Sequence, residues 1–241
     1  MSSINVYTTE KISTSKEELS EKAQKLAIEK DRELPKVGIA PSTIQMLSGG
    51  FCFKYGRVDE EPEDWFDGTR KRPNYEDFSV IVLESGHVAI EDCKKSIESE
   101  IIEFMETHFL ENSCLTEKDW NGDTLRKVEQ NSTSLHALYS TPSSEDTPEK
   151  QKATDKKDLR GTEYYDRMIQ EPMYKLKVKL SKANLNMKIG LDDDGKLTLH
   201  RQNIDLASEL HAVRAVIKEI ESLGEGSSRK VQTRLESSLE S

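Results

Sequence analysis

The chain has 241 residues, of which 34% are hydrophobic and 33% are charged, and its formal net charge is −10. This apolar content is too low for one well-filled core over the whole length, so small cores between disordered segments are expected. The acidic balance argues against a molecule that coats nucleic acid with its whole surface, although a local basic face remains compatible with it.

The spacing of the cysteines and the length of the apolar runs indicate the compartment and bear on contact with membranes. Cys52, Cys93 and Cys114 are scattered without metal-ligand or disulfide spacing, which indicates reduced thiols in a cytosol-like compartment. The N-terminus has no apolar signal core, and no run approaches the roughly 20 apolar residues of a membrane span. We therefore expect no contact with a membrane.

Residues 1–35 are polar and contain one amphipathic stretch, in which Leu19, Ala23, Leu26 and Ala27 recur at helical spacing. The apolar stripe is thin. A marginal helix that a partner completes and a solvated tail are therefore both open interpretations of this region.

Residues 36–74 mix proline and glycine with apolar residues and are predicted to be irregular. Within them, "DEEPEDWFD" places six acids around Trp65 and Phe66. Such a segment either docks on a basic groove through its aromatic rings or is an ordinary solvated loop.

Residues 75–128 are predicted to form the first folded module. "FSVIVL" and "GHVAI" are typical of two short strands, and "EDCKKSIESEIIEFMETHFLEN" has apolar residues every three or four positions, which predicts a helix. Fewer than about 60 residues make a poor core alone, so we expect a homodimer, with packing against residues 36–56 of the same chain as the alternative. The expected dimerisation residues are Val80, Val82, Ile97, Ile101, Phe104, Met105 and Phe109.

Residues 129–165 are rich in Ser, Thr, Pro, Glu and Lys and lack an apolar period, so they are predicted to be a disordered linker. Ser143 precedes Asp146 at the third position, and Thr141 and Thr147 each precede a proline. These three residues are candidate phosphorylation sites.

Residues 166–223 are predicted to be a β-meander followed by a helix. Leu176, Val178 and Leu180 alternate with lysines, and an Asp-Gly turn separates two further alternating runs. Apolar residues from Leu206 to Ile220 then recur in a 4-3-4-3 pattern, and residues 224–241 are predicted to be a polar tail. The expected fold is thus α+β, with two small modules, a central hairpin plus helix and a C-terminal β-meander plus helix, joined by disordered linkers.

No residue pattern predicts catalysis or metal binding. The five histidines stand apart from ligand-spaced partners, and Asp192, Asp193 and Asp194 are consecutive, unlike a calcium loop. We expect no enzyme activity, no catalytic residue, no metal and no cofactor. The remaining signal is a basic strand face, which either contacts an acidic loop or phosphate backbone or is simply solvated. Its residues are Lys175, Lys177, Lys179, Lys182, Lys188, Lys196 and Arg201, extended along the helix by Arg214 and Lys218.

Two segments resemble a known family. "FSVIVLESGHVAIEDCKKSIESEIIEFMETHFLENSCLTE" resembles the central dimerisation domain of rhabdovirus phosphoproteins of the vesiculovirus-like type, and "KIGLDDDGKLTLHRQNIDLASELHAVRAVIKEI" resembles the end of their nucleocapsid-binding domain. The N-terminal region is less acidic and less aromatic than that family's, and an extra polar tail follows the last helix.

The resemblance implies a non-catalytic polymerase cofactor in the host cytoplasm and the virion. Its expected partners are nucleoprotein, both free and RNA-bound, the large polymerase subunit and a second copy, with little direct binding of nucleic acid. The N-terminal helix would keep free nucleoprotein from RNA, and the basic C-terminal residues would hold nucleoprotein–RNA. The alternative is an adaptor that forms a coiled coil through the Leu206–Ile220 seam.

Overall fold

The computed structural model describes residues 2–10, 12, 18, 21–22, 25–27, 36–40, 42–65, 68–110, 113–141, 150–180, 187–200 and 205–237, without the side chains of 36, 60–73 and 224–237. The expected N-terminal helix therefore lies largely outside the described residues, as do Ser143, Thr147, Lys182 and Arg201.

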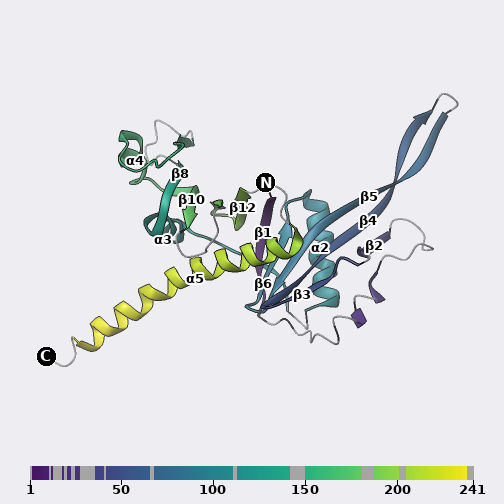
Figure 1. Ribbon diagram of the computed structural model, residues 1–241, viewed down its shortest axis with the longest axis horizontal. Helices are drawn as coiled ribbons and strands as arrows, with labels where there is room; N and C mark the ends of the chain where they lie inside the picture. The colour runs from purple at the N-terminus through teal and green to yellow at the C-terminus, as the bar shows by residue number, and fades with distance from the viewer. Residues whose placement is uncertain are drawn as a thin grey trace. The chain divides into compact units, whose positions relative to one another are not determined.

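Strands predominate over helices in the described chain (Figure 1). The strands are β1 (Ser2–Thr8), β2 (Lys36–Ile39), β3 (Gln45–Leu47), β4 (Gly50–Trp65), β5 (Gly68–Leu83), β6 (His87–Glu91), β7 (Thr116–Glu117), β8 (Ser132–Ser140), β9 (Gln151–Thr154), β10 (Met173–Leu180), β11 (Lys188–Asp192) and β12 (Lys196–His200). The described helices are α2 (Lys95–His108), α3 (Gly122–Asn131), α4 (Glu163–Met168) and α5 (Leu206–Ser237).

The strands form one 12-stranded sheet in the order β2-β4-β5-β6-β1-β12-β11-β10-β8-β9, with β3 paired to β4 and β7 paired to β1. The expectation of two small α+β modules joined by disordered linkers is therefore wrong. Low apolar content did not prevent a large sheet, because the apolar residues are concentrated in short strand runs that are buried on both faces, while other stretches of the same strands are polar. Cys52 and Phe53, neighbours that point to opposite faces, are both fully buried.

Two compact units divide the chain, and each is described by itself. Unit 1 comprises residues 1–4, 117–204 and 211–241, and unit 2 comprises residues 5–116 and 205–210. Three elements therefore contribute to both units, since β1 changes unit after Ile4, β7 after Thr116 and α5 after Leu210.

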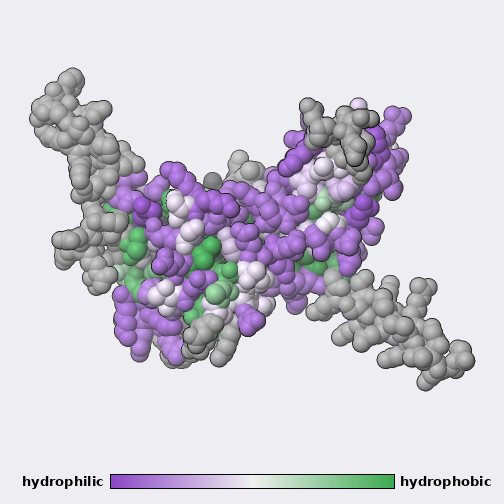
Figure 2. Space-filling view, turned by 180° about the vertical axis from the view of Figure 1, so that it is seen from behind, coloured by the Kyte–Doolittle hydropathy of each residue, from purple (hydrophilic) through white to green (hydrophobic). Residues whose placement is uncertain are grey.

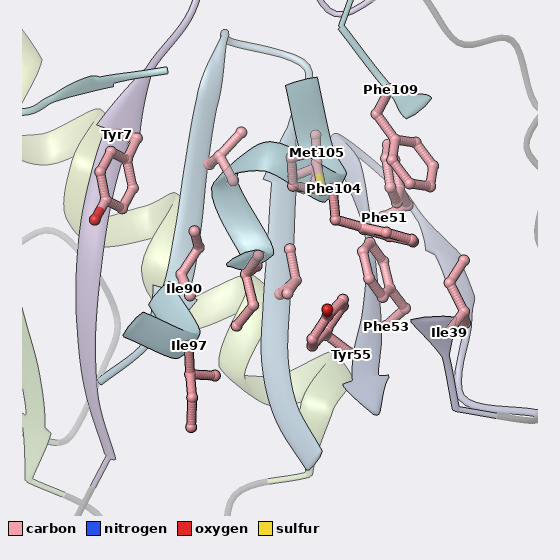
Figure 3. Packing of buried hydrophobic residues seen from close by; sticks show 14 residues of the cluster. Tyr7, Ile39, Phe51, Phe53, Tyr55, Ile90, Ile97, Phe104, Met105 and Phe109 are labelled. Atoms are coloured by element: carbon pink, nitrogen blue, oxygen red, sulfur yellow. The ribbon is translucent and has the colours of Figure 1, made fainter. Parts of the chain in front are cut away.

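The core of unit 2 lies between α2 and one face of the β4–β5–β6 sheet (Figure 3). Aromatic rings fill it, with Phe53 centred 5.6 Å from Phe109 and Tyr55 centred 5.2 Å from Phe104. The predicted helix is confirmed as α2. On the other sheet face Cys52 is buried beneath the start of α5, its Sγ 3.8 Å from the Leu206 carbonyl oxygen.

All seven residues expected at a dimer interface belong to this core within a single chain. Val80 and Val82 come from β5, and the others come from α2 and the turn after it. They pack against Ile39, Phe51 and Phe53 of the same chain, as the same-chain alternative expects. The homodimer itself stays a prediction.

The segments expected to be flexible or irregular at the N-terminal end contain strands. In β1, Ile4 and Val6 are buried and the Tyr7 hydroxyl donates to Glu98 of α2 over 2.6 Å. Strands β4 and β5 pair along sixteen residues each and extend as a long ribbon beyond β2 and β6 (Figure 1).

This ribbon explains why the acidic segment is not a loop. The strand register places Glu61 opposite Arg72 and Glu63 opposite Arg70, so the acidic stretch pairs with the basic "TRKR" stretch that follows it. Opposite charges at facing positions favour strand pairing. The docking role suggested for Trp65 and Phe66 depends on side chains outside the described ones.

Unit 1 contains the segment expected to be a linker, and that expectation is wrong as well. Strand β8 pairs with β9 and, on its other side, with β10. Leu135 and Leu138 of β8 are fully buried, as are Leu125 and Val128 of α3. The meander β10–β11–β12 and helix α5 are confirmed. Helix α5 also continues to Ser237, into the segment predicted to be a tail.

The two units repeat one local arrangement. In each, two antiparallel strands meet at a turn whose glycine has a positive φ, 84° at Gly86 and 83° at Gly195, and a helix follows. Only glycine adopts this backbone conformation without strain. Helix α2 follows the first strand pair and α5 follows the second.

Candidate functional site

One face of the unit 1 sheet is polar because the strand residues alternate. Along β10, Leu176 and Val178 are fully buried, whereas Lys175 and Lys177 point to the opposite face. The register sets Lys177 opposite Gly190 of β11, which in turn faces Thr198 of β12. Gly190 has no side chain, and the space above it is taken by Thr198 and His200, since a Cβ at Gly190 would lie 3.3 Å from Thr198 Cβ and 3.6 Å from His200 Nε2.

A β-bulge turns His136 toward the same face. The β8–β10 register shifts between the pairs Lys177–Ala137 and Val178–Leu135, which leaves His136 as the extra residue. A bulge of this kind re-aims one side chain without ending the strand pair. His136 then lies with Nδ1 3.3 Å from Lys188 Nζ on β11.

A tight loop after β9 adds two more lysines. Its backbone is fixed to β8 by bonds from the Asp155 amide to the His136 carbonyl (3.0 Å) and from the Leu159 amide to the Leu135 carbonyl (2.7 Å). Arg160 anchors the end of the loop through a 2.9 Å ion pair with the buried carboxylate of Glu129. Lys156 and Lys157 therefore hold fixed backbone positions beside the sheet.

Together these elements line an open depression of about 750 Å³. Five lysines and a single aspartate are among its lining residues, so its charge is strongly positive although the whole chain is acidic. The lining residues are His136, Ala137, Tyr139, Lys152, Thr154, Asp155, Lys156, Lys157, Lys177 and Lys188.

Two of these lysines have imidazoles rather than carboxylates as hydrogen-bond acceptors. Lys177 Nζ lies 3.4 Å from Nδ1 of His200, in the same relation as Lys188 to His136. A lysine ammonium can only donate, so each imidazole accepts in its neutral form. The positive charge of both lysines is therefore left without a neutralising partner in these contacts.

The protonation equilibria agree with this geometry. Burial, together with the positive charges of Lys177, Lys175 and Lys188, lowers the pKa of His200 to about 4. Burial and Lys188 likewise lower the pKa of His136. The pKa of Lys177 is lowered by burial and by Lys188 and Lys152. The groups disfavour one another's positive charge, which a bound anion would relieve.

Two tyrosines lie beside the depression. The rings of Tyr139 and Tyr174 meet edge to face with centroids 6.0 Å apart. Lys150 lies over the Tyr174 ring at 4.6 Å, and Lys152 and Lys175 lie over the Tyr139 ring at 5.3 and 5.8 Å. The face thus combines lysines with aromatic surface.

A scan against protein-family models and a search of the curated proteins both found no match to this chain. The function must therefore be argued from the residues. Within the described ranges, no group of three or more His, Cys, Asp or Glu side chains is placed to hold a metal ion, and no helix is long and apolar enough to cross a membrane. Figure 2 views the molecule from behind the view of Figure 1 and shows hydrophilic residues over most of the described surface on this face.

The structure brings together part of the predicted basic set. Lys177 and Lys188 line the depression, and Lys175 lies at its edge in a 2.8 Å ion pair with Asp192. Lys179 of β10 and Lys196 of β12 do not line the depression, and Arg214 and Lys218 lie on α5. The remaining candidate on the described chain, Thr141, is exposed at the end of β8, and its phosphorylation stays a prediction.

Sequence reasoning missed several residues of this face. Lys152, Lys156 and Lys157 were assigned to a linker, His136 was treated as isolated, and no aromatic residue was expected near the lysines. The alternation in "LHALYS" could have indicated β8. Nothing local shows that β8 pairs with β10, because their register depends on residues far apart in the chain.

Proposed function

We propose that the polar face of unit 1 binds the phosphate backbone of a nucleic acid, and that the protein acts by binding rather than by catalysis. The observation that carries this proposal is the pair of lysines, Lys177 and Lys188, whose ammonium groups donate to neutral imidazoles. An anion placed over them would supply the missing negative charge.

The shape of the site favours an extended anion over a small one. The depression is open, and its lysines come from β9, the loop after it, β10 and β11. Adjacent strands lie about 4.8 Å apart, so the ammonium groups are spread along the face rather than gathered round one point. A repeating phosphate chain can neutralise several of them at once.

A role as a polymerase cofactor that holds nucleoprotein–RNA is a further proposal that goes beyond binding of a phosphate backbone. The basic face would then contact the RNA of the template. In the described part of residues 129–165 the structure has β8, β9 and the start of α4 where the phosphoprotein resemblance expects a linker, so the binding role is argued from the face alone. The adaptor alternative is weaker, because Leu210, Val213, Ile217 and Ile220 of its seam are buried in the folded chain.

The first test replaces the two lysines that contact imidazoles. In the full chain, Lys177→Gln with Lys188→Gln should weaken binding of a fluorescein-labelled 20-nucleotide RNA at least tenfold in anisotropy titrations. The slope of log K against log salt should shrink by about 1.4, since each single-strand phosphate contact contributes about 0.7. Both changes should be the same for unrelated RNA sequences, because phosphate contacts carry no sequence information.

Lys218→Gln is the matched control, because it removes the same charge from an exposed position on α5. It should leave the affinity within about twofold. The proposal fails if the double variant binds RNA as the wild type does, or if the wild type binds no RNA and instead binds polyglutamate, which would indicate an acidic protein partner.

A further inference from the structure

We infer that the nucleic acid held by this face is single-stranded and that Tyr139 and Tyr174 stack on its bases. The inference rests on the proposed function and adds the substrate class to it. It is carried by the two rings, which make an aromatic surface at the edge of the lysine cluster.

The backbone brings these rings together by a specific irregularity. The β8–β10 register shifts between the pairs Met173–Ser140 and Lys175–Tyr139, so Tyr174 is the extra residue at that point. A bulge re-aims a side chain, and here it lets Tyr174 and Lys175 both lie beside Tyr139. Regular alternation would have placed Tyr174 and Lys175 on opposite faces.

The lysines over the two tyrosine rings are compatible with a nucleic-acid base as the stacking partner of each ring. Lys150 lies over Tyr174, and Lys152 and Lys175 lie over Tyr139, so each ring has at least one long, flexible cation beside it. When a base takes the place over the ring, the ammonium group can move to the adjacent phosphate. Both contacts then form within one nucleotide.

The ring geometry selects single strands over duplexes. The two ring planes are inclined by 62°, so they cannot both lie against one continuous base stack. In a duplex the base faces are covered by neighbouring base pairs, and only edges and phosphates are accessible. In a single strand, bases can splay apart, and stacking on aromatic side chains tolerates any sequence.

The test uses three labelled probes of equal length and phosphate number per strand: a mixed-sequence DNA 15-mer, an abasic 15-mer and the corresponding duplex. The wild-type chain should bind the 15-mer about tenfold more tightly than the abasic strand, because stacking adds to phosphate contacts. It should also bind the 15-mer more tightly than the duplex.

Variants separate stacking from charge. Tyr139→Leu with Tyr174→Leu should remove the tenfold preference for the base-bearing strand over the abasic strand. Tyr139→Phe with Tyr174→Phe should retain the preference, since the rings remain. The inference is overturned if the wild type binds abasic and base-bearing strands equally, or if the Leu variant keeps the preference.

These outcomes are distinct from failure of the proposed function. If all three probes bind with an affinity that depends on Lys177 and Lys188 but not on the bases, phosphate binding stands and stacking is wrong. If no probe binds in a way that depends on these lysines, both proposals are wrong.

Discussion

At the scale of single residues, His200 shows how one group can make binding depend on pH. Its imidazole is neutral because burial and three nearby lysines lower its pKa from 6.5 to about 4. A polyanion over the same face would neutralise the lysines and attract a proton, so the pKa of His200 should rise toward 6.5 in the complex. Between about pH 4 and 6.5 the complex would therefore bind more protons than the free protein.

Linkage then requires that affinity increases as the pH falls through this window. We expect a lower pH, 5.5 against 7.5, to tighten RNA binding, and His200→Gln to remove part of that gain. Free-chain stability should change in the opposite direction, because the unfolded chain takes up the proton near pH 6.5 and the folded chain only near pH 4.

Titrations of the wild type, His200→Gln and His211→Gln at both pH values measure this effect. His211 is exposed on α5 and serves as the control, so its replacement should leave the pH gain intact. An equal gain in the wild type and in His200→Gln would contradict the assignment.

At the scale of elements, apolar periodicity predicted those helices and strands whose burial pattern repeats along a short stretch of sequence. Helix α2 and strand β10 follow from apolar spacing, since each of them buries one face. The β4–β5 ribbon could not be found in this way. Its outer half is polar on both strands, and only the pairing of "DEEPED" with "TRKR" shows that the charges compensate.

The outer half of the ribbon should be dispensable for folding. Beyond Val58 and Tyr75 no other strand is paired to it in the part of the sheet that the structure describes. Asp59 faces Asn74 in the register, so residues 60–73 can be replaced by an Asn-Gly turn that joins the two strands. We expect the thermal midpoint, followed by circular dichroism, to change by no more than a few degrees.

Phe53→Ala provides the comparison, because Phe53 is fully buried in the unit 2 core. Truncation of a buried Phe costs about 3–5 kcal/mol and should lower the midpoint clearly. If the ribbon deletion lowers the midpoint as much as Phe53→Ala does, the outer half is part of the stable core and this interpretation is wrong.

At the scale of the whole molecule, the two repeated strand–turn–helix arrangements carry different charges. In unit 1, Lys188 and His200 face each other across the strand pair that meets at Gly195. In unit 2, Ser79 and Glu91 occupy the same sequence positions relative to the turn glycine Gly86. Glu91 accepts from Ser79 Oγ over 2.8 Å and pairs with Lys54 at 3.3 Å. Unit 2 neutralises its charges at these positions, whereas unit 1 leaves positive charge exposed.

The sequence contained only part of this division of charge. Alternation identified Lys175, Lys177 and Lys188 as one face, because a strand fixes which neighbours share a side. The contributions of His136, Tyr139 and Lys152 depend on bulges and on pairing between distant strands. These follow from the assembled sheet, since no short stretch encodes the register that brings them to the lysines.

The whole molecule should also depend on α5, because its first residues belong to unit 2 and its later residues to unit 1. Four large apolar residues that α5 buries in unit 1, at about 2 kcal/mol each, represent on the order of 10 kcal/mol, comparable to the stability of an ordinary protein. They are Val213, Val216, Ile217 and Ile220. A chain that ends at residue 204 should therefore lose structure in both units.

The loss of structure in each unit can be measured with one reporter side chain per unit. Cys52, whose thiol pKa is raised to about 11 chiefly by burial, should become reactive toward a thiol reagent in a Cys93→Ser, Cys114→Ser background. Trp120 is 2% exposed and lies by Ile220 and Leu223, so its fluorescence should shift to the red in a Trp65→Phe background. A chain that ends at residue 223 retains these contacts and should keep both signals. If the shorter chain changes only one signal, α5 stabilises that unit alone, because loss of the shared helix should expose both reporters together.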